Sequence, residues 1–293
     1  MPAAQRVIEL LVCALAQSAR QLETTVFDRC VLVCSNAPTR RVRADLDPLA
    51  QLILDRSGVQ LRSLELICGD ETSCAVVLSR LRAELEPGDE PVLLCAVDSL
   101  VDIHTMAQAN LHKRLRTETN GDGFIPGEAA ACVLVTTSPS PTASRVAGLG
   151  VAHEPATILD TRPHDARGMT NAARAALAEA GWRFADLDLW LADLGGEQYE
   201  FNEIALCCAR LPTERCPSIA LWHPSEYFGS VGVAAGPAAW MLATQASRGG
   251  WAPGRRLLCS STAAAGARSI VLLEAPTAEP PSERLDPVPR WAW

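Results

Sequence analysis

Apolar residues follow two spacings along this chain, one typical of amphipathic helices and one typical of strands. From Arg6 to Leu22 they recur at helical spacing, whereas Val92–Val97 is an unbroken apolar run typical of a buried strand. The same reasoning predicts helices at Arg6–Leu22, Leu46–Leu54, Ser73–Leu85, Thr170–Ala180, Glu200–Leu211 and Gly232–Ala246, and strands at Cys30–Cys34, Leu64–Ile67, Val92–Val97, Ala129–Val135, Arg145–Val151, Leu187–Leu191, Ile219–Leu221, Arg256–Cys259 and Ser269–Glu274.

These elements occur twice in a similar order. In each half a helix precedes a strand, and a later helix is followed by a Pro-Gly pair, Pro87-Gly88 or Pro253-Gly254, and another strand. The duplication predicts an α/β protein with two packed mixed sheets and helices between and outside them. We expect halves at 1–140 and 141–277, joined by the linker Ser138–Thr142, and a Pro-rich tail at 278–293. A polar turn is predicted at Pro38–Val42.

The stretch Val92–Thr136 contains the most specific motif, Asp122-Gly123-Phe124-Ile125-Pro126-Gly127-Glu128. It resembles the Asp-Gly-Phe-Val-Pro-Gly-Glu segment of the β-ketoacyl synthases of the thiolase superfamily. The resemblance implies a layered αβαβα fold of two thiolase-like halves, with Gly123 and Gly127 in a tight turn before a central strand. We expect both glycines at positive φ. The family's usual first strand has no counterpart, since this chain opens on a helix.

The same resemblance places catalytic residues of the family on unlike side chains here. The cysteine nucleophile falls at Asp70 or Glu71, and the two histidines fall at Asp193 and Ser230. The surrounding framework is kept in Gly229 and Gly236. Cys68 is a weak alternative nucleophile, and Cys74 a weaker one, because each is displaced from the expected position. Buried structural cysteine is the preferred interpretation of both.

An acidic cluster accompanies these positions. Glu197, Asp193 and Glu203 surround the turn at Gly195-Gly196, and we expect Glu226 and Ser230 to lie near them. Such a group is typical of a reshaped binding pocket, an acid/base pair or a cation site, whereas the simpler interpretation is a solvated loop with an acidic helix cap.

The histidines show no metal-ligand spacing, so neither a metal nor a cofactor is predicted. His104 and His112 flank an exposed helix that leads into Lys113, Arg114 and Arg116. By resemblance this segment lies near the family's dimer and carrier-protein surfaces. A solvated basic helix is the alternative.

The composition of the chain limits the kinds of partner and the cellular compartment to be expected. The 293 residues carry a net charge of -8 and contain 48% apolar residues, with no basic run, so a nucleic-acid partner is not expected. No apolar run approaches the length of a membrane span, and no signal peptide is recognisable, so we expect a soluble, cytoplasmic protein. Eleven cysteines without a Cys-x-x-Cys pair argue against a disulfide framework and a zinc site. The tail ends in Arg290-Trp-Ala-Trp293, expected to fold over the surface or serve as an interface anchor.

The leading interpretation is a degenerate synthase-like protein that no longer condenses acyl groups and works as a binding, adaptor or assembly factor. Stand-alone proteins of this kind resemble those of type VI secretion loci. Two alternatives stay open: an acyl-thioester enzyme with chemistry relocated to Cys68 or the acidic cluster, and a non-catalytic subunit that pairs with an active synthase. We also expect self-association into a homodimer, or a protein partner. No residue pattern supports an acyl-carrier or acyl-CoA ligand specifically.

Overall fold

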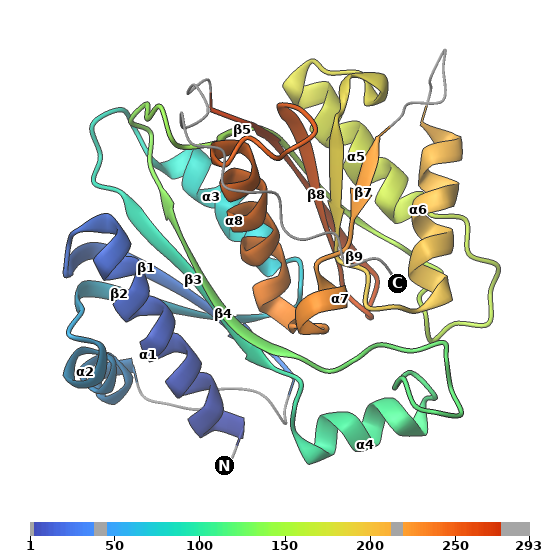
Figure 1. Cartoon of the computed structure of the whole chain (residues 1–293), viewed down its shortest axis with the longest axis horizontal. Helices are drawn as coiled ribbons and strands as arrows, with labels where there is room; N and C mark the ends of the chain where they lie inside the picture. Colours follow the sequence, from blue (N-terminus) through green and yellow to red (C-terminus); the bar gives the residue numbers. More distant parts are fainter. Residues whose placement is uncertain (1–2, 38–45, 212–218, 277–293) are drawn as a thin grey trace.

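The computed structural model describes residues 3–37, 46–211 and 219–276. Two sheets are packed with helices between and outside them (Figure 1). The first sheet has the strand order β2-β1-β3-β4, built from β1 (Val26–Ser35), β2 (Gln60–Gly69), β3 (Val92–Ser99) and β4 (Glu128–Val135). β1 is parallel to β2 and β3, whereas β4 runs antiparallel to β3. β4 is therefore an edge strand among the described residues.

The second sheet has one strand more, in the order β5-β9-β8-β6-β7. Its strands are β5 (Arg145–His153), β6 (Leu189–Ala192), β7 (Ala220–Trp222), β8 (Arg256–Thr262) and β9 (Ala267–Glu274). The run β7-β6-β8-β9 matches β2-β1-β3-β4 in order and direction. β5 then covers the outer edge of β9, and no described strand covers the equivalent edge of β4.

The helices and sheets form five layers held together by three apolar cores. One core packs the central helices against both sheets, and the other two pack the outer helices on each sheet. α1 (Ala3–Leu22) and α2 (Leu46–Ser57) cover the outer face of the first sheet, while α5 (Arg167–Ala180) and α6 (Gln198–Arg210) cover the outer face of the second. α3 (Ser73–Glu84) and α8 (Ala235–Arg248) lie between the sheets. Because side chains alternate along a strand, Val31 and Val33 of β1 face the central helices and Leu32 faces α1.

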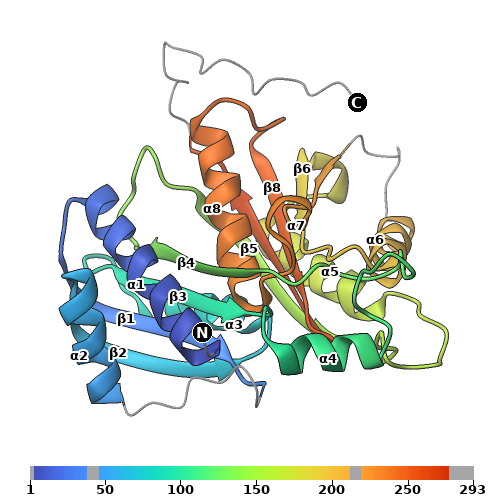
Figure 2. The ribbon, with the colours of Figure 1, turned by 60° about the horizontal axis from the view of Figure 1, so that its bottom comes forward.

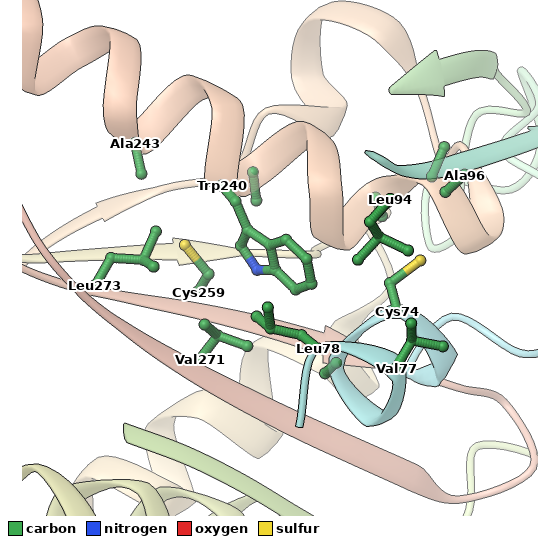
Figure 3. Close-up of a cluster of buried hydrophobic side chains, with 14 of the residues drawn as sticks. Cys74, Val77, Leu78, Leu94, Ala96, Trp240, Ala243, Cys259, Val271 and Leu273 are labelled. Atoms are coloured by element: carbon green, nitrogen blue, oxygen red, sulfur yellow. The ribbon is translucent and has the colours of Figure 1, made fainter. Parts of the chain in front are cut away.

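The central core is centred on Trp240 of α8, which is 6% exposed. Figure 3 shows its indole among side chains from both sheets and from α3, including Leu78 and Val271. Each such side chain, fully buried, stabilises the fold by about 1.5 to 3 kcal/mol before the loss of conformational entropy is counted. The predicted fold class, two packed mixed sheets with helices between and outside, is confirmed.

Most predicted elements are present, with two informative differences. The strand predicted from Leu187 begins at Leu189, because a short helix, η1 (Phe184–Asp186), comes first and Asp188 instead accepts the backbone N–H groups of Arg255 and Arg256 at 2.7 and 2.8 Å. The helix predicted from Gly232 begins as a 3-10 turn, η2 (Gly232–Ala234), before α8.

The short helix α7 (Ser225–Phe228) and the exposed helix α4 (Ile103–Leu111) complete the fold. The predicted turn Pro38–Val42 and the tail Ala278–Trp293 lie outside the described residues, and the division into two halves stays a prediction. Among the described helices, none combines the length and the apolarity needed to cross a bilayer.

Candidate functional site

The Asp122–Glu128 motif, which precedes β4, and the segment around Gly229, which follows α7, meet at one junction. The backbone N–H of Gly127 donates to the carbonyl of Ser230 at 2.8 Å, and the N–H of Ser230 donates to the carbonyl of Ile125 at 2.7 Å. Gly229 is left-handed at this contact, with φ of 75°. These reciprocal bonds join the segment before β4 to the segment between α7 and η2.

The expectation of positive φ at Gly123 and Gly127 is wrong, because neither is among the described glycines with that backbone geometry. Both positions require glycine because neighbouring backbone leaves no room for a side chain. A Cβ atom on Gly127 would collide with the carbonyl oxygen of Phe228, and one on Gly123 would lie 2.7 Å from the backbone of Arg114. Gly236 is less confined, since a Cβ there would meet the Ser261 hydroxyl at 3.2 Å.

The acidic residues of the first motif act as structural anchors. Asp122 accepts the backbone N–H of Gln198 at 2.7 Å, at the first residue of α6. Glu128 accepts both guanidinium donors of Arg6 at 2.7 and 2.6 Å, and also the hydroxyl of Ser99 at 2.8 Å. The motif therefore connects α1, the first sheet and the second half.

A cavity of about 300 Å³ opens beside this junction. Its wall draws on both halves and on α4, which lies at the border of the molecule in both ribbon views (Figures 1 and 2). The lining residues are Glu71, Leu100, Thr105, Gln108, Ala109, His112, Arg114, Phe124, Ile158, Leu159, Asp193, Glu197, Tyr199, Glu200, Ser230, Gly232, Thr262, Ala263, Ala264 and Arg268.

Three positions at which the resemblance places catalytic residues reach this one cavity. Glu71 precedes α3, Asp193 follows β6, and Ser230 follows α7, so segments far apart in the chain bring them together. Glu197 lines the cavity as well. These four residues were candidates from the sequence, and the structure groups them as the candidate site.

Other candidates lie elsewhere. Glu226 is exposed, pairs with His223 at 2.7 Å and does not line the cavity, so its closeness to the acidic cluster stays a prediction. Glu203 is buried against Arg268 outside the lining. Cys68 lies near the end of β2 and does not line the cavity, while Cys74 is buried in the central core, where desolvation raises the pKa of its thiol.

Carboxyl groups dominate the electrostatics of the site. Burial raises the pKa of Asp193 well above its usual range, and the negative charges of Glu200 and Glu71 raise it further. Burial, reinforced by the charge of Glu197, raises the pKa of Glu200 to about 7. Opposing this, the Glu200 carboxylate accepts the backbone N–H of Gly195 at 2.6 Å. Part of this acidic group is therefore protonated near neutral pH.

The cations that line the cavity are engaged with carboxylates. Arg114 donates two hydrogen bonds to Glu197 at 2.9 and 2.6 Å and lies over the ring of Phe124, with 5.6 Å to the ring centroid. Arg268 is 2% exposed and donates to both oxygens of Glu203 at 2.8 and 2.9 Å. The pair of Arg114 with Glu197 is bidentate and geometrically specific, whereas Arg268 shares a single Nε–H between the two Glu203 oxygens. Both pairs stiffen the wall of the cavity.

Arg268, Tyr199 and Glu200 were not among the sequence candidates for the site. Tyr199 accepts a bond from Arg268 at 3.1 Å and donates to the carbonyl of Ala156 at 2.6 Å. The sequence signal for Tyr199 and Glu200 was their proximity to Asp193 in the chain, and Arg268 had no such signal. The side-chain partners of Arg268 and the carbonyl that Tyr199 binds lie tens of residues away, which residue spacing does not reveal.

A metal is not required to explain the nearby buried acids. Glu154, His164 and Glu203 bring candidate ligand atoms within 4.8 Å of one another. However, both oxygens of Glu203 are bonded to Arg268, and Glu154 accepts the backbone N–H of Gly168 at 2.8 Å. The guanidinium therefore supplies the positive charge that a metal would otherwise bring.

No protein-family model matches this chain, and no curated protein matches it, but solved structures do. The ishigamide ketosynthase/chain length factor superposes with a TM-score of 0.71 at 15% identity, over 92% of this chain and 82% of that one. The ketosynthase from module 6 of the bacillaene synthase from Bacillus subtilis 168 gives 0.70 at 14%, over 94% and 59%. The AntDE:AntF structure, a type II PKS acyl-carrier protein in complex with its ketosynthase bound to the hexaketide, gives 0.71 at 11%, over 92% and 85%.

These similarities define the fold as the thiolase-like fold of ketosynthases, as the motif predicted. Identities of 11 to 15% show the fold and leave the activity to be argued from the site. The chain spans 59% of the bacillaene ketosynthase, so parts of that protein have no aligned counterpart here.

Proposed function

We propose that this ketosynthase-like protein does not condense acyl groups and functions by binding, as an adaptor or assembly factor. The observation that carries the proposal is the set of side chains that line the cavity. Glu71, Asp193 and Ser230 stand together at the three positions where the resemblance places a cysteine and two histidines, and no cysteine is among the described lining residues.

The chemistry of these side chains supports the proposal. Acyl transfer in the resembled family needs a thiolate to accept the acyl group and imidazole groups to polarise a thioester carbonyl. Among the described lining residues, His112 is the one histidine, and it lies on the α4 side of the cavity. Ser230 therefore lacks the adjacent base that a serine nucleophile needs. In addition, a negative charge on Glu71 disfavours entry of a malonyl carboxylate, because like charges repel strongly where water is scarce.

The exposed helix α4 supports a role in binding. It has no buried residue, and Ile103 and Leu111 at its ends are 70% and 77% exposed. Asp102 holds its first turn by accepting the N–H groups of His104 and Thr105 at 3.0 and 3.1 Å. A capped helix with no fully buried residue, beside a cavity, is a suitable surface for a protein partner.

Two cellular settings fit this function. Resemblance to synthase-like proteins of type VI secretion loci favours an adaptor for secretion. The alternative, a non-catalytic partner subunit of an active synthase, is favoured by the superposition on a ketosynthase/chain length factor. Neighbouring genes distinguish them: sheath or effector genes support the first setting, and a synthase or acyl-carrier gene supports the second. Relocated chemistry at Cys68 is less favoured, because Cys68 lies outside the cavity lining.

A malonyl-thioester assay tests the loss of activity. We expect the purified chain to release no acetyl thioester or carbon dioxide from malonyl-CoA or malonyl acyl-carrier protein, alone or with an acyl primer. Glu71→Gln and Cys68→Ala are the matched variants, and both should behave like the parent chain. Turnover that disappears in either variant would overturn the proposal and identify the reacting group.

A further inference from the structure

Two cysteines face each other across the last strand pair of the first sheet. Cys95 of β3 and Cys132 of β4 are direct partners in the antiparallel register. Their sulfur atoms lie 2.8 Å apart, although the residues are separated by 37 positions. Neither residue takes part in the candidate site, since neither lines the cavity.

The position of this pair in the ladder suits a cross-strand bond. Leu100 and Gly127 continue the same register, and the N–H of Leu100 donates to the carbonyl of Gly127 at 2.9 Å, so they form a hydrogen-bonded pair. Pairs alternate along an antiparallel ladder, which makes Cys95 and Cys132 a non-hydrogen-bonded pair. Such pairs have Cα atoms about 4.5 Å apart, within the range of about 4.4 to 6.8 Å that a disulfide spans.

The two thiols differ in access. Cys95 is fully buried, and desolvation raises the pKa of its thiol, with further increases from Cys132 and Cys30. Cys132 is only partly buried, on the strand whose outer edge no described strand covers. An oxidant from solution therefore reaches Cys132 before Cys95.

We propose that Cys95 and Cys132 form a reversible disulfide, with a low-molecular-weight disulfide as the oxidant. The Cys132 thiolate attacks one sulfur of oxidised glutathione, which forms a mixed disulfide and releases one glutathione thiolate. The Cys95 sulfur attacks the Cys132 sulfur and passes its proton to the departing glutathione thiolate, which leaves as the second glutathione. The protein loses two protons and two electrons, and the oxidant becomes two glutathione molecules.

The bond would close the excursion that carries α4 and the Asp122–Glu128 motif. That excursion contributes Thr105, His112 and Arg114 to the cavity wall. Formation of the disulfide would therefore make this wall of the candidate site stiffer. Closure of a loop this long also restricts the unfolded chain, which should raise the melting temperature by several degrees.

The test is disulfide mapping of the full chain by mass spectrometry after treatment with oxidised glutathione and alkylation of the remaining thiols. We expect one linked peptide pair joining Cys95 to Cys132, which disappears after reduction with dithiothreitol. The variant Cys95→Ser lacks the resolving thiol, so it should retain glutathione on Cys132. Cys132→Ser should acquire neither the link nor stable glutathione at Cys95.

Cys34 and Cys68 serve as the internal control, because they are partners in a parallel strand pair of the same sheet. They should remain unlinked. A link at Cys34 and Cys68 instead, stable glutathione on Cys132 of the parent chain, or no modification of Cys132 would each overturn the proposal. The mapping on the parent chain decides the outcome even where a serine variant does not fold.

Discussion

The pKa of Glu200 is set by opposing effects of its surroundings. Its carboxylate accepts backbone N–H groups at the start of α6, which favours the charged form, yet burial and the charge of Glu197 favour the neutral form. The neutral form prevails up to a pKa of about 7. Stability should therefore depend on pH in a range where ordinary carboxyl groups are fully ionised.

The free energy of unfolding should fall as pH rises from 5 to 8. The folded pKa of Glu200 lies above its ordinary value of 4.5, so the folded state holds the proton more tightly than the unfolded chain. Its stabilising contribution is complete below about pH 4.5 and is lost as pH rises through 7. Glu200→Gln cannot titrate and should reduce the fall by about 1 to 3 kcal/mol.

Urea unfolding at pH 5 and pH 8 measures this effect. Asp160→Asn is the control, because pairing with Arg162 lowers the pKa of Asp160 to about 2 and its titration ends below this window. Asp193 shifts in the same direction as Glu200, so some pH dependence should persist in Glu200→Gln. An equal slope in the parent chain and in Glu200→Gln would refute the assignment.

At the scale of elements, the junction between the halves depends on close backbone approach rather than on side chains. The segment that ends at Gly127 and the segment that contains Gly229 exchange two backbone hydrogen bonds. Neither segment belongs to a regular sheet, although an isolated bridge joins Pro126 to Ser230. The contact positions Ser230 and Phe124 at the cavity at the same time.

Gly127→Ala should destabilise the protein by about 2 to 4 kcal/mol, because the added methyl group would collide with the Phe228 carbonyl and separate the two segments. Gly121→Ala is a matched control in the same excursion. A Cβ there meets nothing within 4 Å, and Gly121 is not at positive φ, so its effect should stay within about 0.5 kcal/mol. Equal melting temperatures for the two variants would contradict this account of the junction.

At the scale of the whole molecule, the first sheet ends in two edge strands among the described residues, β2 and β4. Exposed polar side chains of β2, including Gln60, Arg62 and Ser63, reduce unspecific pairing at that edge. β4 has only apolar residues after Glu128 and lacks such protection. An edge of that composition is normally covered in a stable protein.

We predict a homodimer formed through the strand pair β3–β4, at the open edge of β4, and the excursion that carries α4. An isologous contact would extend the first sheet across a two-fold axis. Light scattering at micromolar concentration should give twice the monomer mass of 31.3 kDa. A monomer at every concentration would reject the homodimer and leave these surfaces to a different protein.

The order and type of most elements follow from the sequence, because apolar spacing in a helix or strand reflects burial of one face or two. Val92–Val97 was predictable as a doubly buried strand for this reason, and the observed β3 is buried at every position. The motif Asp122–Glu128 predicted the fold as well. Glu71, Asp193 and Ser230 were identified as site positions by the resemblance of other segments to the family's catalytic motifs.

Only the tertiary structure decided which residues meet. Arg114 and Glu197 are 83 positions apart, and Arg268 and Glu203 are 65 apart, so no local spacing indicates their pairing. The same holds for Cys95 opposite Cys132, since a one-residue change of register would turn their side chains to opposite faces. Gly127 requires glycine because a distant carbonyl occupies the space beside it, and that contact exists only when the two halves are packed together.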